Sequence, residues 1–271
     1  MIHVGISGWN YPPWRGVFYP KGLPHKRELP YVVEHLNSVE INGSFYALQR
    51  RASWESWYAQ ARPGFVYSVK GSRYISHMKK LAGIEQPLAN FLASGLLALD
   101  DRLGPILWQL PPTLGFDAER LDAFFAVLPR TTGEAAEFAK GHDERIKHGA
   151  LTEAPSDRPL RYALEVRHQS FRNPEFIALA RERDFAVVVA DTAGKWPLIE
   201  EVTTDFMYVR LHGDVELYAS GYSDQALDGW ARKIRRWKRT GEVFVYFDND
   251  VKVRAPFDAM SLSKKLGIQT S

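Results

Sequence analysis

Polar side chains that could do chemistry end a series of short apolar runs in this chain of 271 residues. They combine carboxylates, cations, imidazoles and amides, and they are Glu40, Asn42, Lys70, Gln109, Glu165, Arg167, His168, Asp191, Arg210, His212, Asp248 and Asn249. Brought together, carboxylates and imidazoles could transfer protons, while lysine and arginine could hold an anion. Glu40, Glu165 and His212 are the candidate catalytic residues, and the others, apart from Asp248, are candidate ligand contacts.

Strand periodicity predicts that several of these groups point the same way. In SVEIN, Glu40 and Asn42 share one face of an extended chain, and the apolar residues share the other. In MYVRLH, Arg210 and His212 share a face in the same manner. If the apolar faces pack against helices, we expect the polar faces to point into one pocket.

Two pairs in this set have a purely structural alternative. The same alternation puts Glu165 beside Arg167 and leaves His168 on the opposite face, unless the strand has already ended. Glu165 with Arg167, or Glu40 with Arg210, could be ion pairs that only satisfy each other, since isolated buried charges are costly. Polar groups at the ends of all the runs would be a costly way to build a core, so we favour a ligand site.

An aromatic segment, WNYPPWRGVFYP, follows the first apolar run. Aromatic rings beside a pocket can stack on bases or on the faces of sugars, but they can equally pack a loop against the fold. We favour the packing interpretation for Phe18 and Phe45. The aromatic residues that we expect at a ligand are Trp9, Tyr11, Tyr46 and Tyr222.

Segments with strand periodicity alternate along the chain with segments with helical periodicity, and these segments must position the polar groups. Eight runs have the length and composition of strands: residues 3–7, 38–42, 65–70, 105–110, 161–167, 185–191, 206–212 and 242–248. Segments with helical periodicity lie between them: 27–37, 53–62, 117–128, 174–183 and 225–239. We therefore predict an α/β fold, a single (β/α)8 TIM barrel with a parallel eight-stranded barrel, as one domain over residues 1–271. Such a barrel carries its site at the carboxyl ends of the strands.

Two regions depart from this rhythm. Residues 75–102 predict a long helix or two helices, with Pro87 expected to end or kink the first piece. Residues 129–160 predict a helix followed by an exposed loop.

Composition narrows the function classes. The absence of cysteine excludes disulfides, thiolate nucleophiles and cysteine-ligated metals, and a net charge of +3 is too small to indicate a nucleic-acid binder. The densest basic run lies on a predicted helix, and we favour a solvated helix face for it: Arg232, Lys233, Arg235, Arg236, Lys238 and Arg239. No secretory signal pattern or run of about 18 apolar residues is present, so we expect a cytoplasmic protein with no membrane contact.

The familiar motifs for phosphate loops, dinucleotides, zinc proteases and serine hydrolases are absent from the sequence. We therefore expect no cofactor. The weaker alternative is a divalent metal ion held by Glu165, Asp191, His212 or Asp248.

Nine ordered blocks resemble one known family. They are GISGWNYPPWRGVFYP, EINGSFY, SVK, LWQLPPTL, LEVRHQSF, VVAD, YVRLHG, YSD with a tryptophan-containing helix after it, and YFDND. Together they resemble the YecE-like family, DUF72, from residue 3 to about residue 260. The resemblance implies a TIM barrel of unestablished activity. It also implies an analogy to the endonuclease IV and xylose isomerase barrels, although their metal-binding histidines have no counterpart here.

The pattern of that family falls on Gly8, Trp9, Tyr11, Trp14, Glu40, Asn42, Phe45, Tyr46, Lys70, Gln109, Pro111, Glu165, Arg167, His168, Asp191, Arg210, His212, Gly213, Tyr218, Tyr222 and Asn249. Asp248 departs from it, because the family often has a second asparagine there, and the added charge could alter the choice of ligand.

Three functions fit the polar set. The leading hypothesis is a hydrolase-like or lyase-like enzyme for a phosphorylated or nucleic-acid-like anion. In it, Lys70, Arg167 and Arg210 clamp the anion, a glutamate of the set is the base and His212 is the acid.

The second hypothesis is a carbohydrate-active enzyme with Glu40 and Glu165 as its carboxylate pair and Trp9, Trp14 and Tyr46 as sugar platforms. The third is a non-catalytic nucleic-acid-binding protein that uses the aromatic loops and the basic helix.

Overall fold

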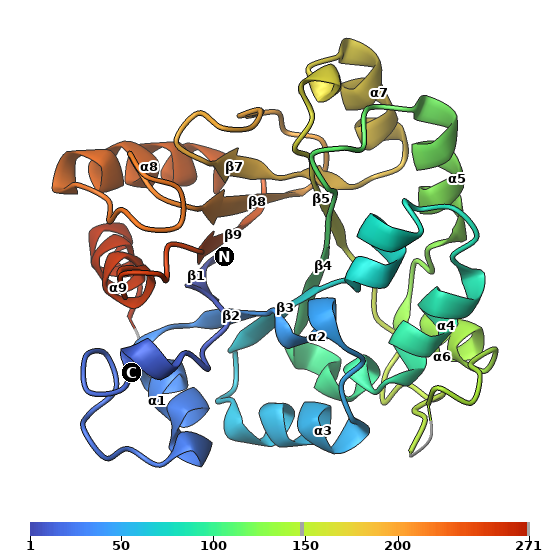
Figure 1. The fold of residues 1–271 in the computed structure, drawn as a ribbon, viewed down its shortest axis with the longest axis horizontal. Coiled ribbons are helices and arrows are strands. Elements are labelled where there is room, and N and C mark those ends of the chain that lie inside the picture. Colours follow the sequence, from blue (N-terminus) through green and yellow to red (C-terminus); the bar gives the residue numbers. More distant parts are fainter. Residues whose placement is uncertain (147–148, 270–271) are drawn as a thin grey trace.

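Nine parallel strands curve around a common centre, and helices surround them on the outside (Figure 1). The computed structural model describes residues 1–146 and 149–269. The strands are β1 (Ile2–Ser7), β2 (Ser38–Ile41), β3 (Val66–Lys70), β4 (Leu103–Gln109), β5 (Tyr162–Glu165), β6 (Ala186–Val187), β7 (Val189–Asp191), β8 (Phe206–Leu211) and β9 (Glu242–Phe247). Their order in the sheet is β6-β5-β4-β3-β2-β1-β9-β8-β7, which makes a nearly closed barrel of the TIM type.

The prediction of eight strands was wrong by one, because the run at 185–191 holds two strands. β6 pairs with β5, whereas β7 pairs with β8 at the other edge of the sheet. Val188 lies between them, and its amide donates to Leu164 O at 3.0 Å. The two edges of the sheet therefore meet within this one run, so the barrel has eight strand positions filled by nine strands.

Helices cover the outer face of the sheet. They are α1 (Glu28–His35), α2 (Gly43–Tyr46), α3 (Arg51–Gln60), α4 (Glu85–Ala93), α5 (Ala118–Val127), α6 (Thr132–Ala139), α7 (Pro174–Glu182), α8 (Asp224–Trp237) and α9 (Ala255–Leu266). Shorter turns of 3-10 or π helix are η1 (Pro12–Trp14), η2 (His25–Arg27), η3 (Tyr74–Met78), η4 (Leu96–Arg102) and η5 (Gln169–Phe171). The five expected helices all form, and no described helix combines the length and apolarity that a membrane crossing requires.

The expectation for Pro87 was wrong. The proline lies in the first turn of α4, where a missing amide hydrogen costs nothing because the first N–H groups of a helix have no partner in it. The break comes earlier, where Lys80 and Leu81 have φ of 49° and 70°. The helix expected within 129–160 is α6, and residues 147–148 lie outside the described residues.

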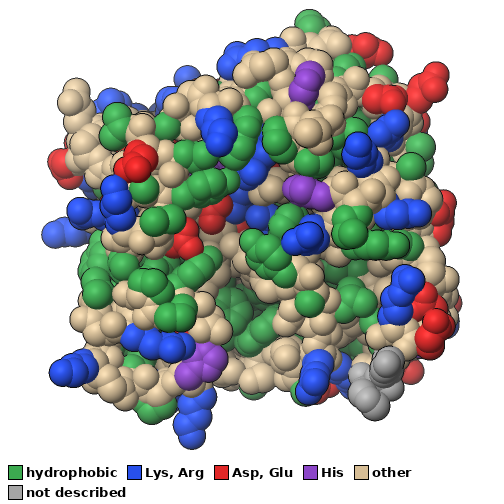
Figure 2. Space-filling model, viewed as in Figure 1, with side chains coloured by type: hydrophobic (Ala, Val, Ile, Leu, Met, Phe, Trp, Pro, Cys, Tyr) green, Lys and Arg blue, Asp and Glu red, His purple; other side chains and the backbone are tan. Residues whose placement is uncertain are grey.

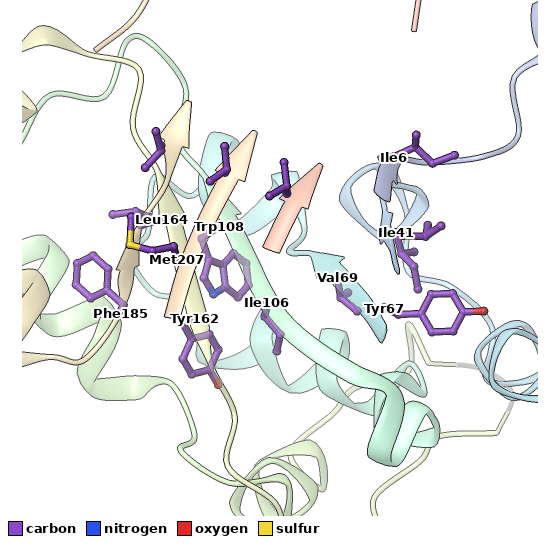
Figure 3. Close-up of a cluster of buried hydrophobic side chains, with 14 of the residues drawn as sticks. Ile6, Ile41, Tyr67, Val69, Ile106, Trp108, Tyr162, Leu164, Phe185 and Met207 are labelled. Atoms are coloured by element: carbon purple, nitrogen blue, oxygen red, sulfur yellow. The ribbon is translucent and has the colours of Figure 1, made fainter. Parts of the chain in front are cut away.

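Alternation along the strands separates two cores. Apolar side chains that point outward pack beneath the helices, among them Ile6, Ile41, Val69, Trp108 and Leu164 (Figure 3). On α8 the buried stripe includes Trp230 and Trp237, and most of the basic run on that helix is exposed.

Inward-pointing side chains fill the barrel in layers, as expected for this fold. Phe206 and Phe244 pack together near the amino ends of the strands. Above them, Tyr246 Oη lies 2.7 Å from Ser38 Oγ, and Tyr208 Oη donates to Glu40 Oε2 at 2.6 Å. The interior therefore changes from apolar to polar toward the carboxyl ends of the strands, where the predicted site lies.

Glu242, the first residue of β9, contacts two basic side chains at the amino end of the barrel. It lies 3.3 Å from His3 Nε2 and 2.6 Å from Arg161 Nη1, and these two contacts lower the pKa of Glu242 to about 2. A carboxylate with a lowered pKa stabilises the fold above its ordinary pKa, and this stabilisation is lost as the pH falls through the lowered value.

We expect Glu242→Gln to reduce the free energy of unfolding by about 1 kcal/mol at pH 7, because solvent screens this partly exposed group. The difference from the unsubstituted protein should shrink as the pH approaches 2. Urea denaturation at a series of pH values measures it, and a difference that does not vary with pH would contradict the assignment.

Candidate functional site

Arg210 of β8 is the centre of a buried polar network at the carboxyl end of the barrel. The side chain is fully buried. Its Nε and Nη2 donate to the two oxygens of Glu40 at 3.1 and 2.9 Å, and its Nη1 donates to Glu165 Oε2 at 2.6 Å. Nη2 also lies 2.9 Å from both Asp248 Oδ2 and Ser7 Oγ. Three carboxylates from β2, β5 and the segment after β9 thus surround one guanidinium.

The contacts of Arg210 use up its hydrogen-bond donors. Gln109 Oε1 and His212 Nε2 each lie 3.4 Å from Nη1, and a guanidinium has five N–H groups to share among all these partners. Arg210 was predicted to clamp an anionic ligand directly. In this geometry it holds carboxylates of the protein instead, and a ligand would have to displace one of them.

Neighbouring cations favour the ionised forms of Glu165 and Asp248. Burial by itself would raise the pKa of Glu165, but Arg167 and Arg210 outweigh it and hold that pKa well below its usual range. Burial also opposes ionisation of Asp248, and again Arg210 and His212 hold the pKa of that carboxyl low. A carboxylate of low basicity suits the positioning of Arg210, and the predicted catalytic roles of Glu40 and Glu165 stay predictions.

His212 lies between two of these carboxylates. Its Nδ1 is 3.0 Å from Asp248 Oδ2, and its Nε2 is 3.7 Å from Glu165 Oε2. The Nδ1 contact lacks the alignment of a hydrogen bond. The ring is fully buried and packs edge-on against Tyr218. An imidazole in this place could pass a proton between carboxylates, which is compatible with its predicted role as an acid.

Arg167 lies at the edge of the Arg210 network, and two of its three guanidinium nitrogens make hydrogen bonds. Its Nε donates to Glu165 Oε1 at 2.8 Å, its Nη2 donates to Tyr218 Oη at 3.2 Å, and its guanidinium lies 3.9 Å from the ring of Trp196. Its Nη1 has no hydrogen-bond partner among the residues that the structure describes. Arg167 is therefore held on two sides and can offer two N–H donors to a ligand.

Lys70, the last residue of β3, is a second basic residue near the Arg210 network. Its side chain is largely buried, and its Nζ lies 4.5 Å from the centre of the Phe45 ring. Within the described part of the chain, its Nζ has neither a hydrogen bond nor an ion pair. Burial and the nearby Arg210 lower the pKa of Lys70 to about 8.

The mouth of the barrel is polar on both sides. β3 and β5 flank β4, and β9 lies across the barrel from β4, so Lys70 and Arg167 come from strand ends opposite the one that precedes Asp248 and Asp250. Figure 2 shows acidic and basic side chains gathered around a hollow near the centre of this face.

Of the aromatic residues predicted to contact a ligand, some lie at the mouth of the barrel and others are buried in the core. Tyr11 Oη donates to Ser7 O at 2.6 Å, and Trp9 is half-buried against Trp57. Tyr46 is 69% exposed and borders a separate cavity of about 320 Å³ beside the mouth. Trp14, offered above as a sugar platform, is fully buried, so that assignment was wrong.

Most of the remaining predicted residues support loops of the rim. Tyr222, in the loop after β8, donates through Oη to Asp191 Oδ2 at 3.0 Å and through its backbone N–H to Asp258 Oδ2 at 3.1 Å. Asn249, after β9, donates through Nδ2 to the same Asp258 oxygen on α9 at 2.8 Å. His168 comes after the end of β5 and is exposed, and its Nδ1 accepts from Ser170 N at 3.2 Å.

Asn42 lies closer to the network, because its Nδ2 donates to Ser7 Oγ at 3.0 Å.

A family model described as "Protein of unknown function DUF72" matches residues 3–271. The chain belongs to the DUF72 family. The UPF0759 protein YecE of Escherichia coli K12 is 24% identical over 266 residues, which cover 94% of this chain and 89% of YecE. The UPF0759 protein YunF of Bacillus subtilis 168 is 22% identical over 307 residues, covering 100% of this chain and 96% of YunF. The resemblance predicted from the ordered sequence blocks is confirmed.

Solved structures of DUF72 proteins share the fold. The crystal structure of a family member from Thermotoga maritima MSB8 has a TM-score of 0.77 at 24% identity and covers 98% of this chain and 99% of its own. A member from Enterococcus faecalis V583 has a TM-score of 0.74 at 19% identity, with 99% and 96% covered. These likenesses support the TIM-type barrel.

Two groups of this DUF72 protein were missed as site residues from the sequence. Burial together with Arg167 and Lys70 lowers the pKa of His77 to about 4, so His77 is a neutral imidazole beside both cations. It lies on η3, a π-helical turn, and such turns often mark functional sites. Burial and the adjacent Asp248 raise the pKa of Asp250 to about 6. His77 lies in a predicted helical region, away from any predicted strand end, whereas Asp250 follows the eighth predicted strand by two residues but was not chosen as a site residue.

The alternative of a metal ion finds no preformed ligand set. Among residues 1–146 and 149–269, no three histidine or acidic side chains are grouped as metal ligands would be. Of the four groups considered, Glu165 and Asp248 accept from Arg210, and Asp191 accepts from Tyr222.

Proposed function

We propose that this DUF72 protein is an enzyme that acts on a small phosphorylated or otherwise anionic ligand at the mouth of the barrel. The observation that carries the proposal is the pair of cations left outside the Arg210 network, Lys70 and the Nη1 end of Arg167. Cations held in place before a ligand arrives stabilise an anion at little cost in reorganisation.

The acidic residues after β9 suit the uncharged, polar part of such a ligand. Asp250 follows the strand opposite the cations and lies outside the contacts of Arg210, and a carboxylate there can accept hydrogen bonds from hydroxyl groups. A polar molecule with an anionic group at one end and hydroxyl groups at the other fits this distribution of charge.

The two other hypotheses have less support. The carbohydrate hypothesis needs carboxylates free to act on a glycosidic bond, but Glu40 and Glu165 both accept from Arg210. The nucleic-acid hypothesis relies on the basic run of α8, where Lys233 already pairs with Glu200 and Arg235 bonds to Lys265 O.

Calorimetry with inorganic phosphate tests the proposal. We expect Lys70→Met and Arg167→Met each to weaken phosphate affinity at least tenfold, because each removes a charge-assisted contact worth about 1.5 kcal/mol or more. Lys264→Met, which removes an exposed lysine on α9, is the matched control and should leave the affinity unchanged. Equal affinities in all four proteins would contradict the proposal.

A further inference from the structure

We infer that Lys70 is a nucleophilic amine that forms an imine with the carbonyl group of the ligand, which narrows the ligand to an anionic aldehyde or ketone. This inference rests on the proposed function, since Arg167 would hold the anionic group while Lys70 takes the carbonyl.

The surroundings of Lys70 fix its backbone and leave its amine free. Its carbonyl oxygen accepts from Ser44 Oγ at 2.7 Å, and the amide of Gly71 donates to Leu107 O at 2.8 Å. The Nζ lies against the Phe45 ring and has no ion pair among the described residues. An amine on a rigid strand end, with no carboxylate attached to it, is placed to attack a bound electrophile.

The chemistry of this amine differs from that of a surface lysine. Burial and the positive charge of Arg210 lower its pKa to about 8, against an ordinary value of 10.5. At pH 7 roughly one amine in ten is then uncharged, compared with about one in three thousand for an ordinary lysine. Desolvation and a neighbouring cation are the two known means of activating a lysine nucleophile.

The proposed step balances without an outside oxidant or reductant. The uncharged amine attacks the carbonyl carbon, a C–N bond forms, and the carbonyl oxygen becomes the hydroxyl group of a carbinolamine. That hydroxyl group takes up a proton and leaves as water, and a C=N bond forms. Overall, one ammonium group and one carbonyl group give one protonated imine and one water molecule.

Reductive trapping with glyoxylate, a small anionic aldehyde, tests the inference. Sodium cyanoborohydride reduces an imine to a stable secondary amine, and peptide mass spectrometry then measures the modified fraction of each lysine. We expect Lys70 to be modified at least tenfold faster than the exposed Lys264 of the same chain, with a rate that rises to its half-maximum near pH 8.

The controls separate this inference from the proposed function. Acetaldehyde, which has no negative charge, should react with Lys70 more slowly than glyoxylate does, and Arg167→Met should slow the reaction of Lys70 with glyoxylate. Lys70→Arg keeps the positive charge and should show no trapping at that position. Modification of Lys70 no faster than that of Lys264 overturns the inference. If calorimetry still shows phosphate binding that needs Lys70 and Arg167, the proposed function survives; if it shows none, both fail.

Discussion

Replacing Arg210 with methionine is expected to lower the free energy of unfolding by about 3–5 kcal/mol, the usual cost of leaving buried charges without their partner. Arg210 is fully buried and contacts the carboxylates of Glu40, Glu165 and Asp248. Methionine nearly fills the volume but offers no charge, so these carboxylates would repel one another in a medium of low dielectric constant. Urea denaturation followed by circular dichroism measures the loss.

Neutral partners provide the matched control for this substitution. Adding Glu40→Gln and Glu165→Gln to Arg210→Met removes most of the unpaired charge, and we expect the triple variant to recover at least half of the lost stability. A loss of less than about 1 kcal/mol in the free energy of unfolding of Arg210→Met would contradict this prediction, because the three carboxylates would then not depend on this guanidinium.

Sulfate affinity is expected to fall at least tenfold between pH 7 and pH 10, because Lys70, with a pKa of about 8, loses its charge in this range. The charge is present below pH 8 and absent above it, so binding should be strongest at the acidic end. Sulfate is the suitable probe, since it remains a dianion throughout, whereas phosphate titrates near neutrality. Calorimetry at intervals of one pH unit gives the curve.

Lys70→Arg is the control for that experiment, because arginine keeps its charge over the whole range. Its sulfate affinity should stay level where that of the unsubstituted protein falls toward the affinity of Lys70→Met. A parallel fall in Lys70→Arg would place the titration on a group other than Lys70 and contradict the prediction.

Local patterns predicted the strands well because each depends on residues that are neighbours in the chain. The alternation in SVEIN put Glu40 inside the barrel, and the alternation in MYVRLH did the same for Arg210. Predictions failed where spatial context overrode a local rule. The run at 185–191 divides because it meets two different neighbours, and Trp14 is buried because Tyr11, Phe18 and Tyr19 enclose it.

The sequence by itself determined the alternation of strands and helices, and with it the barrel and the set of polar groups that point inward. Only the tertiary structure decided how those charges divide. Arg210 pairs with Glu40, Glu165 and Asp248, which come from distant parts of the chain, while Lys70 pairs with no carboxylate of residues 1–146 and 149–269. The physical reason is that strand periodicity sets the direction of a side chain, whereas the pairing of charges depends on distances of a few ångströms across the barrel.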